Sequence, residues 1–568
     1  MLDSIYTTTV ADTTQRKTIL DAFLADIDDA PISLSHGLHG GAMKLSRQEL
    51  FARGCALAHR FKSLGVELGD KVMTILPTGL PFLVSTFGAW CSGAAIVPLA
   101  PPTPGSTADY YQKKLASMIR TAKPKVIIAS EVAFDALKKL AELTENTVVL
   151  RDDQTFVDFT GEPHPPYVPT PEDVAHVQFT SGSTSFPKGA LTKHRQLAIN
   201  VKGIGHVVAG GKPSEDKFVT WLPAHHDMGF IGGLCFPFYH GCELFLIPTE
   251  TFIRNPAIWL KTISEARATL SPAPTFAYDL LGSRISDTRL QGIDLSSWRY
   301  GWIGAEPIFL QTLYKFTEKF RNYGLREDTL KPCYGMAEVT LAVTLTALSN
   351  SYKTTWVNQK SLRQSGFAEP SKINADEAVP ITCCGVPIHE TEVKISDESG
   401  KAFEDYRQGR IFVRGSSVME GYLGDLPSPI DEKGWLDTGD LGFKIGEELY
   451  ITGRAKDLII RGGVNIHPQE IEKIADSVEN VRMGTATAFS CVRHEIGREE
   501  IVLVVETRQQ KPEGRKAIVE EIRQKVAQEA SVQLDHIELA ASGTVPKTTS
   551  GKIQRGLCRE NFLKQQNN

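Results

Sequence analysis

The sequence predicts an α/β fold with two parts, a large N-terminal body built on mostly parallel sheets and a small C-terminal α+β domain. Through about residue 445, short apolar segments alternate with stretches of helical periodicity. Such alternation is typical of βαβ units, whose strands run parallel. Beyond that point the chain changes to short β-rich segments and one amphipathic helix. We therefore expect domains at residues 1–454 and 455–568.

The first part of the body carries clear signals for individual elements. Ser46 and Glu49 have the spacing of a capping box and predict a helix that runs to about Leu64. The most apolar window, Pro81–Ala100, is interrupted by Ser, Thr, Gly, Cys and Pro. It therefore predicts a buried helix in the eighties that runs into a strand, rather than a membrane span. Strands are expected here at Lys71–Leu76, Ile96–Pro98, Val126–Ala129 and Thr147–Leu150.

The same alternation of strands and helices continues up to an expected domain junction near Gly453–Lys456. In the body, strands are expected near Phe218–Leu222, Glu243–Ile247 and Arg299–Trp302. Near and beyond the junction, short strands are expected at Leu449–Thr452, Asp457–Ile460 and Ile501–Thr507. Ile518, Ile522 and Val526 recur at every fourth position, which predicts a helix over Lys516–Ala530.

The composition is that of an ordinary globular protein without a nucleic-acid partner. The formal net charge of −5 argues against the basic field that nucleic acid or an anionic membrane would require. Nine cysteines lack the spacing of a zinc knuckle, so we expect buried free thiols in a reducing compartment. The N-terminal residues contain no basic region followed by an apolar stretch, so we expect no signal peptide and a cytoplasmic location.

The stretch Phe179–Ala190, FTSGSTSFPKGA, gathers small polar residues around Lys188. It fails the Walker phosphate-loop pattern because Pro187 precedes the lysine and Gly189 follows it. It also matches S-x-x-K at Ser185, but the proline argues against the helical turn that a serine acyl-enzyme needs, and the S-D-N and K-T-G motifs are missing. Two interpretations of this stretch remain. It is either a loop that binds phosphate through its backbone N–H groups and hydroxyls, or a polar surface loop.

Further motifs follow this loop in a fixed order. They are Trp221–Gly229, Gly304–Pro307, Tyr334–Thr340, Asp437–Asp440, Gly453–Asp457 and Pro546–Lys552. Together with TSGSTSFPKG, this set resembles the adenylate-forming superfamily of acyl-CoA synthetases, peptide-synthetase adenylation domains and firefly-type luciferases. The resemblance spans about residues 40 to 560. It implies an enzyme in which a carboxylate attacks the α-phosphate of ATP and pyrophosphate leaves.

The resemblance implies a nucleotide site assembled from several of these motifs. The phosphates would be bound by Thr180, Ser181, Gly182, Ser183, Thr184 and Lys188. The adenine would be enclosed by Gly304, Ala305, Glu306, Pro307, Tyr334, Gly335 and Met336, with Tyr334 stacked on the base. Asp440 would accept hydrogen bonds from both ribose hydroxyls, with Arg454 beside it. Glu338, with Thr184 nearby, would hold Mg²⁺, a cation that keeps phosphate oxygens and water as its other ligands.

The residues implied to be catalytic are Lys552, His226 and Glu338. Lys552 would reach the carboxylate and the α-phosphate only when the mobile small domain closes, and Lys456 would be the hinge of that motion. His226 would lie between the carboxylate and nucleotide pockets. The run His225, His226, Asp227 lacks the H-E-x-x-H spacing, so we expect no metal there and read His225 as a packing or supporting residue.

The finer resemblance is to fatty acyl-AMP ligases, which pass the adenylate to the phosphopantetheine arm of an acyl carrier protein. It rests on the stretches LPAHHDMGFIGG, PTFAYDL and GRAKDLIIRGGVNIHPQEIE and on a polar insertion at about 349–376. In that subfamily the insertion packs on the large domain and hinders the closure that CoA use needs. The wall Ser271–Asp279 is mostly small and apolar, which suits an alkyl chain. The expected acyl pocket contains Met228, Ile231, Ser271 and Phe276.

The expected reaction is the activation of a medium- or long-chain fatty acid with ATP and Mg²⁺, with an acyl carrier protein supplied in trans. The chain departs from the superfamily pattern where Asp437 replaces a common Arg and Lys456 a common Asp. Three alternatives stay open. One is a long-chain acyl-CoA synthetase in which the insertion is a tolerated loop. The others are a serine acyl-hydrolase built on Ser185 and a non-catalytic nucleotide-binding regulator, against which Lys552 and Glu338 argue.

Overall fold

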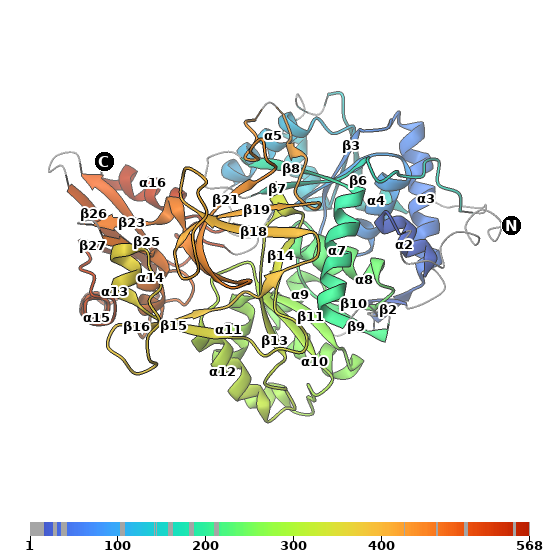
Figure 1. Ribbon diagram of the computed structural model, residues 1–568. Helices are drawn as coiled ribbons and strands as arrows, with labels where there is room; N and C mark the ends of the chain where they lie inside the picture. Colours follow the sequence, from blue (N-terminus) through green and yellow to red (C-terminus); the bar gives the residue numbers. More distant parts are fainter. Residues whose placement is uncertain are drawn as a thin grey trace.

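A large α/β body makes up most of the molecule, and the elements beyond about residue 455 gather at one side of it, drawn in orange and red in Figure 1. The computed structural model describes residues 16–26, 31–35, 42–102, 108–140, 143, 145–156, 163–180, 187–209, 215–424, 426–461, 464–493, 498–548 and 552–566. The expected α/β class is confirmed. Strands alternate with helices along the chain and form two large sheets whose central strands are parallel.

The larger sheet has nine strands within the described residues, and its five central pairings are parallel. In spatial order the strands are β17 (Val386–Pro387), β14 (Ala342–Leu345), β13 (Leu330–Gly335), β12 (Tyr300–Gly304), β11 (Leu270–Pro274), β9 (Lys217–Thr220), β10 (Glu243–Leu246), β1 (Ile32–Ser35) and β2 (Ala42–Leu45). The carboxyl ends of its parallel strands therefore meet at one edge, where open α/β sheets bind ligands.

A second sheet has seven strands in the part of the chain that is described, and four consecutive pairings are parallel. Its order is β20 (Gly421–Tyr422), β8 (Lys188–Lys193), β7 (Val174–Thr180), β4 (Ala95–Leu99), β3 (Lys71–Ile75), β5 (Val126–Ala129) and β6 (Val148–Arg151). Strands β4 and β5 are buried along their whole length, as expected of near-continuous apolar strands covered on both faces.

Helices of the body follow from amphipathic or wholly apolar segments. They are α2 (Ile19–Ala25), α3 (Arg47–Ser63), α4 (Leu80–Cys91), α5 (Ala108–Ala122), α6 (Glu131–Lys138), α7 (His194–Ala209), α8 (Phe236–Tyr239), α9 (Thr249–Arg254), α10 (Ala257–Ala266), α11 (Thr275–Arg284) and α12 (Leu310–Arg321). The apolar helix α4 is packed closely on α3, since a Cβ at Gly54 would lie 2.4 Å from the Cβ of Phe87. The expected buried helix running into a strand is confirmed by α4 and β4.

Two expected element details are wrong in part. Ser46 caps α3 by accepting a hydrogen bond from the Glu49 N–H (3.0 Å), but the Glu49 carboxylate pairs with Arg53 (2.7 Å), so the second bond of a capping box is replaced. The expected strand Asp457–Ile460 begins later, because Ala455–Asp457 forms a 3-10 turn in which Asp457 binds Arg555 (2.7 Å). Strand β23 (Ile459–Arg461) follows this turn and pairs with β24 (Val464–Ile466).

The chain leaves the body through an antiparallel sheet and then forms a separate apolar core. The sheet contains β18 (Thr391–Ser396), β19 (Gly409–Gly415), β21 (Leu436–Ile445) and β22 (Glu448–Arg454). The C-terminal elements are α14 (Pro468–Asp476), β25 (Thr487–Arg493), β26 (Arg498–Glu506), α15 (Pro512–Ala530), β27 (His536–Ala540) and α16 (Arg555–Gln566). Ile518, Ile522 and Val526 of α15 are buried against Ile501 and Leu503 of β26, which confirms the helical face expected there.

The polar insertion is an ordered element rather than a loop. Its strands β15 (Thr354–Asn358) and β16 (Ala378–Thr382) pair antiparallel, and helix α13 (Gln359–Ser365) lies between them in sequence. Val357 and Leu362 are buried with Phe443 and Tyr450 of the antiparallel sheet. The insertion therefore packs on β21 and β22, the last strands before the C-terminal elements.

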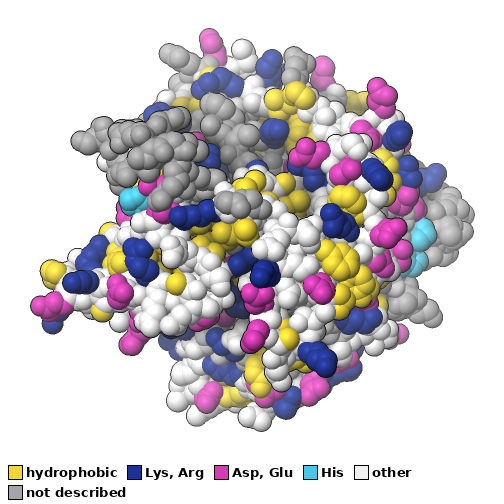
Figure 2. Space-filling model, turned by 60° about the vertical axis from the view of Figure 1, so that its left-hand side comes forward, with side chains coloured by type: hydrophobic (Ala, Val, Ile, Leu, Met, Phe, Trp, Pro, Cys, Tyr) yellow, Lys and Arg dark blue, Asp and Glu magenta, His cyan; other side chains and the backbone are white. Residues whose placement is uncertain are grey.

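The surface and the cysteines agree with the composition. On the face shown in Figure 2, Lys and Arg side chains are interspersed with Asp and Glu and form no broad basic field. None of the nine cysteines, all of which are described, forms a disulfide bond, and all but Cys333 are buried. Among the described helices, none combines the length and the apolar character that crossing a bilayer would need.

Candidate active site

A cavity of 1370 Å³ lies where the carboxyl ends of both large sheets face the C-terminal elements. Pro98 and Thr180 border it at the ends of β4 and β7, and Pro272 and Tyr334 border it on β11 and β13. Residues from beyond 455, among them Lys552, complete the wall. Motifs that are hundreds of residues apart in sequence thus border one cavity.

Tyr334, Asp440 and Arg454 form one connected group in this wall. The Tyr334 hydroxyl donates to Asp440 Oδ2 (2.6 Å), and Arg454 Nε pairs with Asp440 Oδ1 (2.9 Å). Strand pairing sets this arrangement, because Asp440 of β21 lies opposite Arg454 of β22. Burial, and then the Asp440 charge, raise the pKa of Tyr334, so its hydroxyl stays a proton donor at neutral pH.

The two predicted motif glycines serve close backbone packing. A Cβ at Gly304 would lie 2.7 Å from Cys333 Sγ, and a Cβ at Gly335 would lie 2.0 Å from the Leu341 carbonyl oxygen. Gly335 also lines the cavity, whereas Gly304, the last residue of β12, is buried and does not line it. The remaining predicted wall residues, Ala305, Glu306, Pro307 and Met336, all line the cavity.

Glu306 lies at the contact between this wall and the predicted acyl pocket. Its Oε2 accepts a hydrogen bond from the Phe276 N–H (2.9 Å) at the start of α11. Desolvation raises the pKa of Glu306, while that N–H and the charges of Lys552 and Lys547 oppose the shift. The carboxylate therefore faces the lysine loop of the C-terminal domain.

Lys552 and His226 meet in the same cavity. Lys552 is half-buried and is hydrogen-bonded to Thr548, whose N–H donates to the Lys552 carbonyl (2.7 Å) and whose Oγ1 accepts from the Lys552 N–H (3.0 Å). His226 Nδ1 lies 2.7 Å from Asp227 Oδ1. Burial alone would raise the pKa of Asp227, but His226, Lys552 and the Met228 N–H lower it well below its usual range. Asp227 thus stays a carboxylate that orients the His226 ring.

His225 lines the cavity beside this pair but carries a neutral ring. Desolvation, and then the charges of His226 and Lys114, lower the pKa of His225 to about 3. The described residues contain no group of three or more His, Cys, Asp or Glu side chains arranged to hold a metal ion.

Glu338 projects into the cavity from a 3-10 turn, Ala337–Val339, that follows β13. Its Oε1 accepts a hydrogen bond from the Tyr422 hydroxyl (3.0 Å), and desolvation raises its pKa. Of the predicted phosphate loop, Thr180 lines the cavity, and Lys188 lies behind it with Nζ 4.9 Å from the centre of the Tyr422 ring. The other predicted loop residues, Ser181, Gly182, Ser183 and Thr184, lie outside the described residues, as does Ser185.

Two of the four residues expected in the acyl pocket lie elsewhere. Met228 and Phe276 line the cavity, but Ile231 is fully buried in the main core. Ser271 is also fully buried, where its hydroxyl donates to the Val219 carbonyl (2.6 Å) and accepts from Trp259 Nε1 (2.7 Å). Successive strand residues point to opposite faces, so the neighbouring Pro272, rather than Ser271, reaches the cavity.

Trp302 is a wall residue that the sequence pattern did not reveal. Its indole lines the cavity from β12 and packs against Phe236 (5.6 Å) and Phe218 (5.9 Å). Phe236, Leu341 and Leu345 add further apolar wall. The sequence marks Trp302 only as a strand residue, and no motif distinguishes a wall position from a core position.

The insertion connects the body to the C-terminal elements. Arg363 of α13 donates to the Ala530 carbonyl (2.8 Å) and forms an ion pair with Glu470 of α14. Gln359 Nε2 also donates to Glu470 (2.9 Å). Lys456, the predicted hinge, lies in the 3-10 turn between β22 and β23, at the cavity wall. The insertion thus spans both sides of the predicted hinge.

Comparisons with known proteins agree with this site. The model of the family described as AMP-binding enzyme matches residues 27–423. The medium-chain-fatty-acid–[acyl-carrier-protein] ligase JamA of Moorena producens is 31% identical over 91% of this chain and 90% of its own length. The long-chain-fatty-acid–AMP ligase FadD26 of Mycobacterium marinum is 29% identical over 92% of each chain.

A solved structure shows the same architecture over nearly the whole chain. It comes from structural and functional studies of fatty acyl-adenylate ligases from E. coli and L. pneumophila, and it is 32% identical with a TM-score of 0.91. The match covers 98% of this chain and 99% of that chain. The motif order, the fold and the extent of these matches lead to one conclusion: the chain belongs to the AMP-binding enzyme family, within the adenylate-forming superfamily.

Proposed function

We propose that this protein is a fatty acyl-AMP ligase. It activates a medium- or long-chain fatty acid with ATP, releases pyrophosphate, and passes the acyl group to the phosphopantetheine arm of an acyl carrier protein. The observation that carries the proposal is the single cavity shared by Lys552, His226, Glu338 and the Tyr334–Asp440–Arg454 group, with an apolar wall at Trp302 and Phe236. The ligase relatives support both the acid and the acceptor.

The adenylation step needs two anions to approach each other, so positioned charge supplies much of the rate. A carboxylate oxygen of the acid attacks the α-phosphorus, and the bond to pyrophosphate breaks. The charge of Lys552 acts to lower the pKa of both Asp227 and Glu306, which supports assigning its ammonium to the negative charge that develops on the phosphate. His226, oriented by Asp227, lies beside it on the body side of the cavity.

Nucleotide recognition is assigned to the opposite wall. Tyr334 and the Ala305–Pro307 segment enclose the base, and Asp440 binds the ribose with Arg454 beside it. The phosphates lie toward Thr180 and the loop that follows it. A cavity carboxylate such as Glu338 fits Mg²⁺, which takes one or two carboxylates together with substrate phosphates and water. When bound, the ion neutralises charge on the phosphate oxygens.

The division into domains is also part of this proposal. We place the body at residues 1–454 and the mobile domain at 455–568, with Lys456 as the hinge. A separate apolar core beyond residue 455 and the turn at Ala455–Asp457 support this division. Because Arg363 and Gln359 hold Glu470 across that boundary, the insertion resists the rotation that a second, CoA-dependent half-reaction requires.

The test is one reaction set read by mass spectrometry. The protein is mixed with Mg-ATP and fatty acids of graded length, then divided among no acceptor, CoA and a holo acyl carrier protein. Acyl-AMP together with acylated carrier protein, and no acyl-CoA, is the expected result. Rapid acyl-CoA formation would instead identify an acyl-CoA synthetase. Absence of any adenylate would overturn adenylation itself and return attention to a hydrolase or a nucleotide-binding regulator.

A further inference from the structure

Tyr422 touches two charged groups of the proposed site without lining the cavity itself. Its hydroxyl donates to Glu338 Oε1 (3.0 Å), and its ring lies under the Lys188 ammonium, 4.9 Å from Nζ. Tyr422 is half-buried in β20, where it pairs with Ala190 of β8. It therefore lies directly behind a carboxylate and a cation that come from different sheets.

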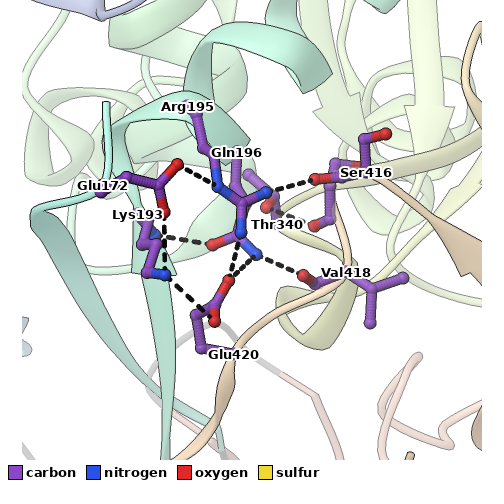
Figure 3. A network of polar contacts seen from close by, with 9 residues as sticks. Glu172, Lys193, Arg195, Gln196, Thr340, Ser416, Val418 and Glu420 are labelled. Atoms are coloured by element: carbon purple, nitrogen blue, oxygen red, sulfur yellow. Dashed lines mark hydrogen bonds and ion pairs between the residues drawn. The ribbon is translucent and has the colours of Figure 1, made fainter. Parts of the chain in front are cut away.

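The strand that carries Tyr422 is held firmly on β8. On one side the Glu420 N–H donates to the Leu191 carbonyl (3.1 Å), and on the other the Leu423 N–H donates to the Gly189 carbonyl (2.7 Å). Figure 3 shows the charged contacts that reinforce this pairing. The Glu420 carboxylate accepts from Arg195 Nη2 (2.6 Å) and pairs with Lys193 Nζ (3.3 Å).

The same chain segment also fixes the turn that carries Glu338. The Met419 N–H donates to the Glu338 carbonyl (2.9 Å), and Thr340 Oγ1 donates to the Ser417 carbonyl (2.7 Å). Thr340 has a φ of +67°, which is uncommon for a β-branched residue and persists only where its surroundings hold it. Residues 416–422 thus hold both the backbone and the side chain of Glu338.

We infer that Tyr422 is a positioning residue for adenylation: its hydroxyl orients the Glu338 carboxylate and its ring orients the Lys188 ammonium. This inference rests on the proposed function. A neutral hydroxyl aims the carboxylate without cancelling its charge, which a lysine or arginine partner would do. Groups that orient a metal ligand in this way commonly change metal affinity by about 10–100-fold when they are removed.

Two substitutions separate the contacts of Tyr422. Tyr422→Phe removes the hydroxyl and keeps the ring under Lys188, whereas Tyr422→Leu removes both. The control is Tyr450→Phe, which removes a hydroxyl that donates to Glu448 (3.1 Å) away from the cavity. Binding of Mn²⁺ in the presence of α,β-methylene-ATP is measured by electron paramagnetic resonance, and thermal unfolding is followed in parallel.

Tyr422→Phe is expected to raise the Mn²⁺ dissociation constant by about 10–100-fold. Tyr422→Leu is expected to raise the concentration of α,β-methylene-ATP needed for half-maximal Mn²⁺ binding by a further factor of about 2–30, the range of a cation–π contact. Tyr450→Phe should match the wild type. In a Glu338→Gln background, Tyr422→Phe should have no further effect on Mn²⁺, because its partner is already altered.

Either of two results overturns the inference. One is wild-type Mn²⁺ affinity in Tyr422→Phe. The other is an equal loss of affinity when Glu338→Gln is already present, which would mean that Tyr422 acts through general stability. The binding assay contains no fatty acid and no acceptor. If the enzyme formed no acyl-AMP, the proposed function would be contradicted, but the Mn²⁺ affinities of the variants could still be compared.

Discussion

At the scale of one residue, the most specific prediction concerns the ammonium group of Lys552. Lys552→Ala is expected to lower kcat for pyrophosphate release by about 10²–10³-fold, the loss typical of one aligned charge donor. The side chain is half-buried on a surface loop, so thermal unfolding should not change. The control is Lys516→Ala, an exposed lysine of the same domain. A rate loss below threefold in Lys552→Ala would remove this lysine from the chemistry.

At the same scale, Trp302 is predicted to limit the length of the acid that the cavity accepts. Its indole fills apolar space beside Phe236, so Trp302→Leu should lengthen the pocket. Each CH₂ that newly fits contributes about 0.8 kcal/mol, or about fourfold in kcat/KM. Measured across saturated acids of increasing length, the optimum should move to longer chains. An unchanged optimum with normal kcat would show that the acyl chain runs elsewhere.

At the scale of the element, helix α13 links the insertion to the C-terminal domain through one buried arginine. Arg363 is only 8% exposed and binds both Glu470 and the Ala530 carbonyl. Arg363→Ala removes the hydrogen bond to Ala530 and leaves the partly buried Glu470 carboxylate with Gln359 but without this cation, at a cost of about 1.5–3 kcal/mol. We expect a lower Tm and, because the domain is released, the appearance of acyl-CoA when CoA is the acceptor.

The matched control for this helix is Lys360→Ala. Lys360 lies on the exposed side of α13, so its removal should change neither Tm nor the acceptor. If Arg363→Ala loses stability but still makes no acyl-CoA, the contact is structural and the choice of acceptor lies outside α13.

At the scale of the whole molecule, buried neutral histidines predict sensitivity to acid. Burial lowers the pKa of His176 to about 3 and the pKa of His194 and His240 to about 4. Unfolding exposes these rings, whose pKa then rises to about 6.5. The unfolded chain thus binds more protons below that pH, so this stability is present above about pH 6.5 and is lost as pH falls toward 4.

The measurement is the pH dependence of Tm between pH 7 and pH 5, compared between the wild type and single histidine variants. Each such ring adds up to about 1.4 kcal/mol per pH unit once the pH is well below its unfolded pKa. His240→Gln should reduce the slope, whereas the exposed His389→Gln should not. A slope in His240→Gln equal to that of the wild type would mean that the His240 ring is protonated in the folded protein.

Much of the molecule follows from local sequence. Apolar periodicity and turn residues act over short distances along the chain. They therefore predict the positions of individual elements, such as the strand Val126–Ala129 and the buried face of α15. The resemblance to the adenylate-forming superfamily implied Tyr334, Asp440, Glu338 and Lys552 as site residues, and all four line the cavity. Their residue types reflect what phosphate and ribose chemistry needs.

Only the tertiary structure decided whether a side chain points into the cavity or into the core, and which residues from other elements pack against it. Ser271 and Ile231 point into the core, because the face that a strand or helix presents depends on packing partners distant in sequence. Trp302 and Tyr422 acquire their surroundings from other strands, and no local pattern records those neighbours. The sequence by itself determined the superfamily and the order of its motifs. The long-range contacts determined the wall of the pocket, the link through Arg363 and the groups that orient Glu338.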